Sequence, residues 1–155
     1  MQRDYLVRTI EHFVQALLSI TKLRKAKEYD QAKKALQTTA SSLLKIDLSL
    51  LSFTPLAHIQ DLFKDYTGRL ETDRCALAAE LILEQAFVEE ALDHHALALH
   101  FKQISLYLFA LSIPLEPSLQ RPEIFAKVEA LKQEAQEFPP EIVEALFKVQ
   151  SFLKD

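Results

Sequence analysis

The chain of 155 residues contains a single glycine, Gly68. Glycine supplies the positive φ angles of tight hairpin turns and allows the backbone to approach phosphate groups closely. A chain with almost no glycine is therefore poorly suited to β-sheets joined by tight hairpins, and it lacks the glycine-rich loops that bind nucleotides. This feature predicts an all-α protein.

Size and composition are typical of one folded domain. A chain of this length can bury roughly 70% of the surface that it exposes when unfolded. Hydrophobic residues make up 49% of the sequence and charged residues 26%, which is far from the low hydrophobicity and high charge of disordered chains. We therefore expect one helical domain over residues 1–155.

Several features predict a cytoplasmic location. Residues 1–13 alternate charged with apolar side chains and lack the apolar core of a signal peptide. The most hydrophobic run, residues 104–113, has about half of the ~20 residues needed to cross a bilayer. The single cysteine, Cys75, cannot form an internal disulfide. We expect no contact with a membrane.

Apolar residues at spacings of three and four predict two N-terminal helices. The stripe from Tyr5 to Leu18 predicts a helix over residues 4–27, and a second stripe predicts a helix over residues 30–45. The connection between them is short, so the two helices should be antiparallel neighbours.

A short helix and a long apolar hairpin are predicted next. Thr54 and Pro55 supply an N-cap and a proline at the first helical position, and Gly68 is the expected end of that short helix. The segments 75–92 and 97–113 are apolar around most of the helix circumference, which predicts a buried central hairpin.

Prolines divide the C-terminal third of the chain. Three prolines within residues 114–122 cannot continue a helix and predict a linker. Residues 123–155 predict a helical hairpin interrupted by Pro139 and Pro140. With the body at residues 1–113, this makes about six long helices plus one short connecting helix.

Consecutive antiparallel hairpins predict an α-α superhelix, in which each pair buries one face against the next. Residues 27–36, KEYDQAKKAL, look like the turn and second helix of a tetratricopeptide repeat (TPR). Tyr29 and Ala32 occupy the positions where that repeat has a bulky residue and a small one. The fold class is therefore expected to be TPR-like.

The N-terminal pattern DYxxRxIE, at residues 4–11, carries a further resemblance. Together with KEYDQA and with LILEQA at residues 81–86, it resembles an uncharacterised family of small bacterial proteins with TPR-like helical hairpins. The resemblance covers roughly residues 1–110. It implies the helical fold, and no activity, ligand or catalytic residue comes with it.

The densest group of potential metal ligands lies between Glu89 and His100, in EEALDHHALALH. Metal ligands on one helix face are spaced by three or four residues, as Glu90 and His94 are. These two residues nevertheless lie on opposite sides of the predicted helix break, and neither Glu-x-x-His nor His-Glu-x-x-His is present. A solvated turn is favoured over a metal site, and no cofactor is predicted.

Cys75 would be a candidate nucleophile if a histidine lay nearby. A position in the first turn of a helix would lower the pKa of its thiol. The sequence brings neither His12 nor His58 close to it. A buried structural cysteine, and a protein that is not an enzyme, are the favoured interpretation.

Charge is distributed unevenly along the chain. Residues 1–36 hold eight basic and four acidic side chains, against ten and eighteen in residues 37–155. A basic first hairpin could bind nucleic acid, but basic side chains also suit the solvated faces of an ordinary hairpin. The acidity of the whole chain makes nucleic-acid binding the weakest hypothesis.

The C-terminal helices carry more apolar residues than a terminal hairpin needs, since capping helices should be polar outside. Phe138, Phe147 and Phe152 lie in or beside them. These helices should either fold back onto the body or meet another chain, so the three phenylalanines are a candidate interaction surface.

Two hypotheses of function follow. The leading one is a non-enzymatic interaction or scaffolding protein, which holds a partner helix or a second copy of itself between hairpins or at the C-terminal helices. The alternative is a small-molecule or metal-binding helical bundle centred on Glu89–His100. The first predicts a protein partner or a homodimer, and the second predicts bound zinc or iron.

Overall fold

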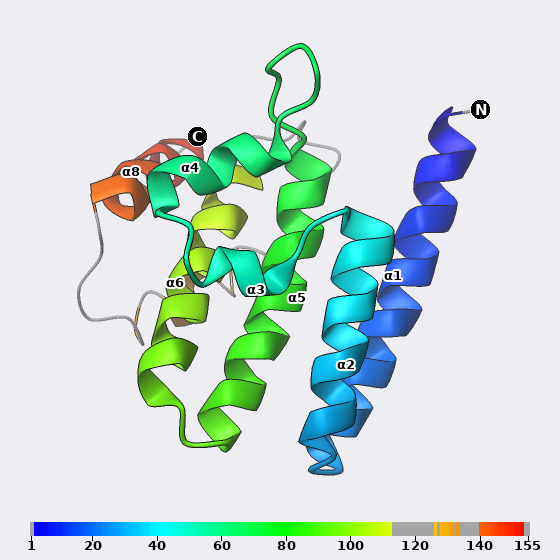
Figure 1. Cartoon of the computed structure of the whole chain (residues 1–155). Coiled ribbons are helices and arrows are strands. Elements are labelled where there is room, and N and C mark those ends of the chain that lie inside the picture. The colour runs from blue at the N-terminus through cyan, green and yellow to red at the C-terminus, as the bar shows by residue number, and fades with distance from the viewer. Residues whose placement is uncertain (1, 113–125, 127, 132, 134–139, 154–155) are drawn as a thin grey trace.

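The computed structural model describes residues 2–112, 126, 128–131, 133 and 140–153. Within these residues the chain is all-α and contains no strand. Figure 1 shows how the helices are arranged. The long helices are α1 (Gln2–Lys25), α2 (Tyr29–Thr39), α5 (Thr72–Ala91), α6 (His95–Ser112) and α8 (Pro140–Leu153).

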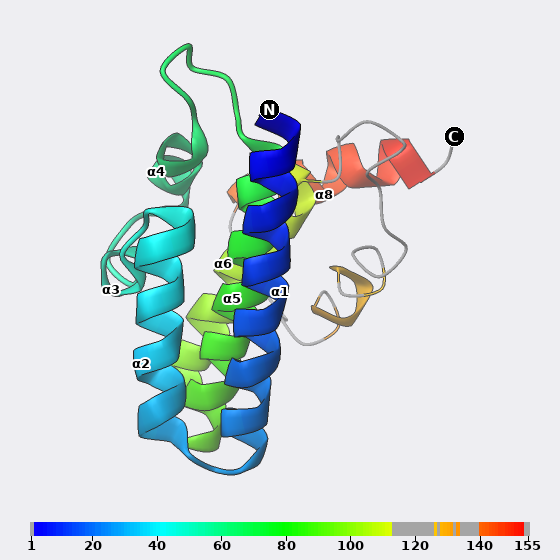
Figure 2. The same cartoon turned by 90° about the vertical axis from the view of Figure 1, so that its right-hand side faces the viewer.

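The first two helices form the predicted antiparallel hairpin, and they lie side by side along one flank of α5 (Figures 1 and 2). Lys27 allows the tight turn between them by adopting a positive φ of 62°. Helix α2 is shorter than predicted. It passes into a turn of π-helix, Ala40–Leu44, which ends at Lys45 with a φ of 57°.

Two short helices connect this hairpin to α5. Helix α3 (Leu48–Leu51), which the apolar pattern did not predict, begins at Asp47, whose side chain accepts a hydrogen bond from the backbone N–H of Ser49 at 3.0 Å. Helix α4 (Leu56–Ile59) continues into a 3-10 turn, Gln60–Phe63. Helix α4 and this 3-10 turn together correspond to the predicted short helix.

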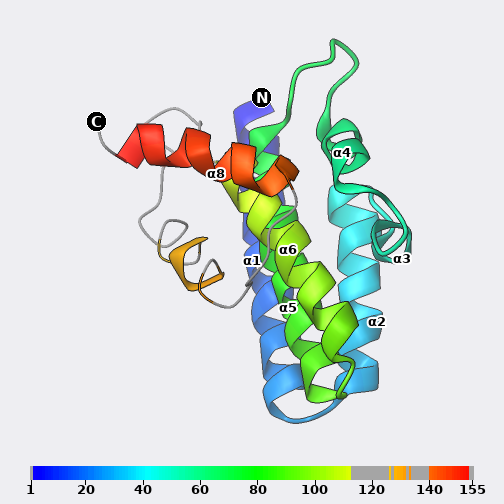
Figure 3. The same ribbon diagram turned by 90° about the vertical axis from the view of Figure 1, so that its left-hand side faces the viewer.

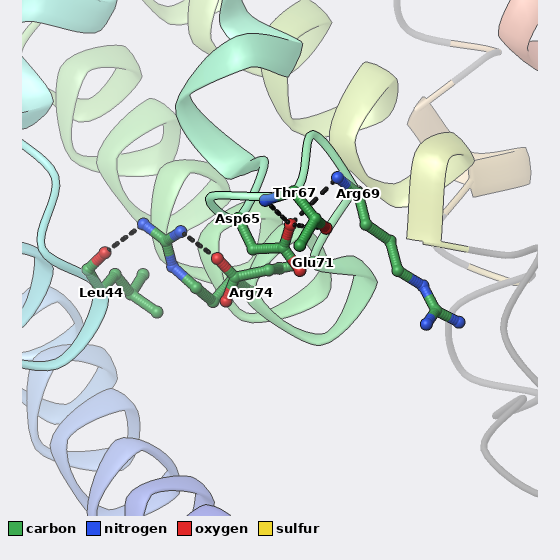
Figure 4. A network of polar contacts seen from close by, with 6 residues as sticks. All are labelled: Leu44, Asp65, Thr67, Arg69, Glu71 and Arg74. Atoms are coloured by element: carbon green, nitrogen blue, oxygen red, sulfur yellow. Dashed lines mark hydrogen bonds and ion pairs between the residues drawn. The ribbon is translucent and has the colours of Figure 1, made fainter.

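The prediction that Gly68 ends the short helix was wrong. That helix ends at Phe63, and Gly68 instead provides a φ of 85° in the loop that follows. The carboxylate of Asp65 closes the loop, accepting hydrogen bonds from the backbone N–H groups of Thr67 at 2.8 Å and Arg69 at 3.0 Å (Figure 4). Such local hydrogen bonding favours aspartate in turns.

Arg74 ties the start of α5 to the end of the first hairpin. Its guanidinium donates to the backbone oxygen of Leu44 at 2.6 Å and to the Glu71 carboxylate at 3.2 Å (Figure 4). The same group lies over the ring of Phe63, 5.4 Å from its centre. One side chain therefore links three segments that are distant in sequence.

Helices α5 and α6 form the predicted central hairpin and make the largest helix-to-helix contact among the described residues. Side chains around most of α5 and α6 are buried, as their apolar composition predicted. The buried hydroxyl of Ser105 donates a hydrogen bond to the backbone oxygen of Ala79 at 2.7 Å. The hairpin is the centre of the core.

The other helices pack on opposite sides of this hairpin. Helices α1 and α2 contact α5, whereas α8 crosses the C-terminal end of α6 (Figures 1 and 3). A single cluster of buried side chains extends from Phe13 in α1 to Leu146 in α8. The first, central and last helices therefore share one core.

The C-terminal predictions are partly outside the described residues. The linker predicted at residues 114–122 lies there. Helical residues at 126, 128–131 and 133 fall in the first predicted C-terminal helix, and Val128 and Leu131 are buried. Helix α8 begins at Pro140, as the sequence predicted. None of the helices in the described part of the chain is long and apolar enough to cross a membrane.

Candidate functional site

The predicted ligand cluster contains one buried carboxylate, Glu89, of which 3% is exposed. Its Oε1 accepts hydrogen bonds from Lys33 Nζ at 3.0 Å and from Gln85 Nε2 at 2.8 Å. Its Oε2 accepts from His94 Nδ1 at 2.6 Å. Three donors, one from α2, one from α5 and one from the turn before α6, therefore converge on one carboxylate.

The pair singled out by sequence spacing is not the pair that forms. Glu90 binds Lys102 Nζ at 2.8 Å, while His94 binds Glu89. Asp93 has a φ of 65° and turns the chain after α5, so that the side chain of His94 reaches Glu89 and not Glu90. In the part of the chain that the structure describes, no three histidine, cysteine, aspartate or glutamate side chains are grouped so that they could hold a metal ion.

The environment of Glu89 keeps its carboxylate charged. Burial alone would raise its pKa, but the hydrogen bonds from His94 and Lys33 outweigh burial and lower the pKa below its usual value. A carboxylate that already accepts three hydrogen bonds has little basicity left for proton transfer. The Glu89 cluster is thus built as a fixed ion-pair network.

A small pocket of about 190 Å³ lies beside this network, between α2, α3, α5 and α6. Several of its polar side chains already bind other protein groups. Ser49 Oγ donates to the Asp47 carboxylate at 2.6 Å, and Ser52 Oγ donates to the backbone oxygen of Ser49 at 2.8 Å. The pocket therefore leaves few groups to recognise a ligand.

A second largely buried carboxylate joins α5 to α1. Glu84 accepts from Arg24 Nε at 2.6 Å and from Thr21 Oγ1 at 3.0 Å. The Arg24 guanidinium also lies over the ring of Phe87, 5.0 Å from its centre. Like Glu89, this carboxylate is matched by a cation from the first hairpin.

Cys75 lies where the sequence placed it, in the first turn of α5, and its side chain is completely buried. Burial raises the pKa of the thiol to about 12 and outweighs the opposing effect of the positive charge of Arg74. Because the thiolate is the nucleophilic form, Cys75 is a packing residue.

A concave feature of mixed polarity lies between α4, α6 and α8, and we call it the α8 cleft. Its volume is about 370 Å³. Alanine and leucine side chains line much of it, and polar groups come from the 3-10 turn after α4, from α6, from α8 and from the start of α5. The lining residues are Ala57, Gln60, Leu70, Thr72, Tyr107, Ala110, Leu111, Glu141, Glu144 and Ala145.

Tyr107 lies in the wall of the α8 cleft with 5% of its surface exposed. Its hydroxyl is 3.4 Å from Gln60 Oε1, a long hydrogen bond. Burial raises the pKa of the phenol, and the negative charges of Glu141 and, to a smaller extent, Glu144 raise it further.

The sequence predicted an interaction surface at Phe138, Phe147 and Phe152, in or beside the C-terminal helices. Phe138 lies outside the described residues. Phe147 and Phe152 belong to α8, and their side chains lie outside the described part of the structure. The cleft residues of α8, Glu141 and Glu144, were missed, although their spacing of three puts them on one helix face.

Comparison with protein-family models, with curated proteins and with solved structures finds no match to this chain. Function must therefore be inferred from the geometry and chemistry of the residues themselves.

Proposed function

We propose that the protein is a non-enzymatic, TPR-like interaction module of the cytoplasm, which holds a segment of a partner protein in the α8 cleft. The observation that carries this proposal is the cleft itself, which apolar and polar side chains line together between α4, α6 and α8. Interaction proteins of stacked helical hairpins bind partners along such concave surfaces.

The dimensions of the cleft support a short contact. Its volume of about 370 Å³ is near the lower end of ligand sites. It accommodates one or a few side chains and not a whole helix. The remaining affinity would come from exposed apolar side chains close to the lining residues in sequence, such as Val143 of α8, which exposes 52% of its surface, and Leu62, which exposes 43%.

The alternative, binding of a metal or small molecule at Glu89–His100, has less support. The oxygens of Glu89 already accept from Lys33, Gln85 and His94. A metal would have to displace these donors and leave the Lys33 ammonium beside a cation. Cys75 does not supply the nucleophile that an enzyme would need, since its thiol is buried and protonated.

Site-specific photo-crosslinking in cells of the source organism would test the proposal. A photoreactive residue at Thr72, on the rim of the cleft, should capture a partner that the same residue at the exposed Gln31 of α2 does not capture. The captured partner is then purified, and its affinity for the wild-type protein is compared with its affinity for the Ala57→Trp variant. The tryptophan should fill the cleft from its exposed α4 side. We expect at least about a tenfold loss of affinity.

Equal capture from both positions, or no capture from Thr72, would count against the α8 cleft as a binding site. So would an affinity that Ala57→Trp leaves unchanged. Because Ala57 is exposed, this variant should remain folded, which circular dichroism can verify.

A further inference from the structure

Helix α1 exposes a row of large apolar side chains. Val7, Val14 and Leu18 expose 48%, 43% and 58% of their surface, whereas Phe13 and Ile20 of the same helix are buried. At 3.6 residues per turn, residues spaced by seven and four fall on one narrow face. Single exposed apolar residues are normal on a protein surface, but a row of them along one helix face is typical of a contact surface.

Charged side chains belong to the same face. Glu11 lies within the apolar row, and Lys22 and Lys25 follow its C-terminal end, and all three side chains are exposed. Each residue is three or four positions from the next, so the set stays on one side of the helix. We call this set the α1 face, and in chain order it consists of Val7, Glu11, Val14, Leu18, Lys22 and Lys25.

The α1 face lies on an outer helix of the molecule. Helix α1 packs against α2 and α5, and Figures 1 and 2 show it at the outer edge of the helix bundle. At 1.5 Å per residue, the face is about 27 Å long. A second helix of similar length can therefore lie along it.

The order of the residues fits a second copy of α1 that runs antiparallel to the first. In a two-fold symmetric pair centred between Val14 and Leu18, Val14 of each copy lies against Leu18 of the other. Glu11 then lies opposite Lys22 of the second copy, and symmetry forms this ion pair twice. The α1 face is therefore complementary to itself in both shape and charge.

Only the antiparallel direction has this property. It also matches the ends of the face, where Val7 meets the methylene stem of Lys25. A parallel pair would place Glu11 against Glu11 and Lys22 against Lys22, and like charges that face each other across an interface are unfavourable. The charge order thus selects both the occupant and its direction.

We infer that the α1 face is a self-association surface, through which two copies of this protein form an antiparallel, two-fold symmetric dimer. One helix from each copy gives an interface at the lower end of the usual sizes. The dimer is therefore reversible, with a Kd on the order of 10–100 µM. Because α8 lies on the other side of the central hairpin, the α8 cleft of each copy stays accessible (Figures 1 and 3).

Charge reversal tests this inference by sedimentation equilibrium of the whole chain, from about 5 µM to about 1 mM. Wild-type protein should pass from monomer to dimer over this range. Glu11→Lys and Lys22→Glu each place like charges opposite one another twice, and each should weaken association at least about tenfold. The double variant restores both ion pairs in the reversed sense, so its Kd should return to within about threefold of the wild-type value.

A mixture of the two single variants adds a second test. Glu11→Lys protein and Lys22→Glu protein associate poorly alone, but in a mixed dimer both pairs again have opposite charges. The mixture should therefore form heterodimers about as strongly as wild type dimerises. Glu28→Lys and Lys34→Glu are the controls, since these exposed residues lie outside the α1 face. They change the net charge equally and should leave association unchanged.

The apolar centre of the face is tested separately. Leu18→Ser removes an apolar contact twice in the symmetric dimer and should weaken association about tenfold. Leu50→Ser is the matched control, because Leu50 of α3 exposes 61% of its surface, similar to the 58% of Leu18. All substituted side chains are exposed, so the variants should remain folded, which circular dichroism can verify.

Three results would overturn the inference. If the wild-type protein is still monomeric at about 1 mM, a second copy is not the occupant of the α1 face. If the dimer survives both single charge reversals, it uses another surface. If the double variant associates as weakly as the single variants, the antiparallel pairing of Glu11 with Lys22 is wrong.

Discussion

The central hairpin meets a different kind of neighbour on each side. Where α5 faces α1 and α2, the carboxylates of Glu84 and Glu89 are largely buried, and each accepts hydrogen bonds from a cation of the first hairpin. Where α6 faces α8, the carboxylates of Glu141 and Glu144 are among the groups that line the α8 cleft.

The difference shows that one residue type serves two purposes according to its surroundings. A buried carboxylate without a partner is costly, so those of α5 specify how the first hairpin docks. A carboxylate at the edge of a cleft retains part of its hydration, so it constrains the docking of its helix less. The first interface therefore holds its carboxylates buried, while the second leaves its carboxylates at a cleft.

The largest effect should come from breaking the apolar hairpin that both interfaces share. Phe109 of α6 is completely buried, and Phe109→Ala should lower the free energy of unfolding by about 3–5 kcal/mol because it leaves a cavity. Urea denaturation followed by circular dichroism measures this loss. Leu99→Ala removes a side chain of the same helix that is 42% exposed, and should cost less than about 1 kcal/mol.

A smaller loss is expected from the polar interface. Glu89→Ala leaves Lys33 and Gln85 without their shared acceptor, and should lower the free energy of unfolding by about 2 kcal/mol. The loss stays below that of a fully buried pair because Lys33 is 35% exposed and regains water. Glu90→Ala is the matched control, and it should cost less than about 1 kcal/mol. Equal losses at the two positions would contradict a special role for Glu89.

Much of the fold could be predicted because local patterns determine it. Apolar spacing located α1, α2 and the α5–α6 hairpin, and Pro140 marked the start of α8. The same reasoning missed α3, since a helix of four residues is too short to show a periodic apolar pattern. The TPR-like superhelix and the bacterial family resemblance stay predictions.

The sites were harder to predict because they depend on geometry between elements. The spacing of Glu90 and His94 assumes a continuous helix, but the positive φ of Asp93 ends that continuity and directs His94 to Glu89. The α8 cleft requires α8 to cross α6, a contact between distant segments that periodicity does not encode. The functional hypothesis named phenylalanines of the C-terminal helices, whereas the residues of α8 that line the described cleft are Glu141, Glu144 and Ala145.

The pH dependence of stability should reveal the contribution of the buried Glu89 carboxylate. Folding lowers the pKa of Glu89, so the stabilisation from its charged carboxylate is complete above the unfolded-state pKa near 4.5. This stabilisation is lost as the pH falls through the folded-state pKa. The stability difference between wild type and Glu89→Gln should therefore be constant from pH 7 to pH 5 and should shrink below pH 4.5. Urea unfolding at several pH values measures it. A difference that grows below pH 4.5 would contradict the sign of this linkage.

The smallest effect on stability should come from the cleft, and this result would sharpen the comparison most. Glu141→Gln and Glu144→Gln should change the free energy of unfolding by less than about 0.5 kcal/mol, since carboxylates at a solvated edge contribute little to folding. Thermal unfolding of the two variants and of the wild-type protein measures these changes. Loss of stability comparable to that of Glu89→Ala would mean that these residues hold α8 in place, and the division between a structural and a recognition interface would then not hold.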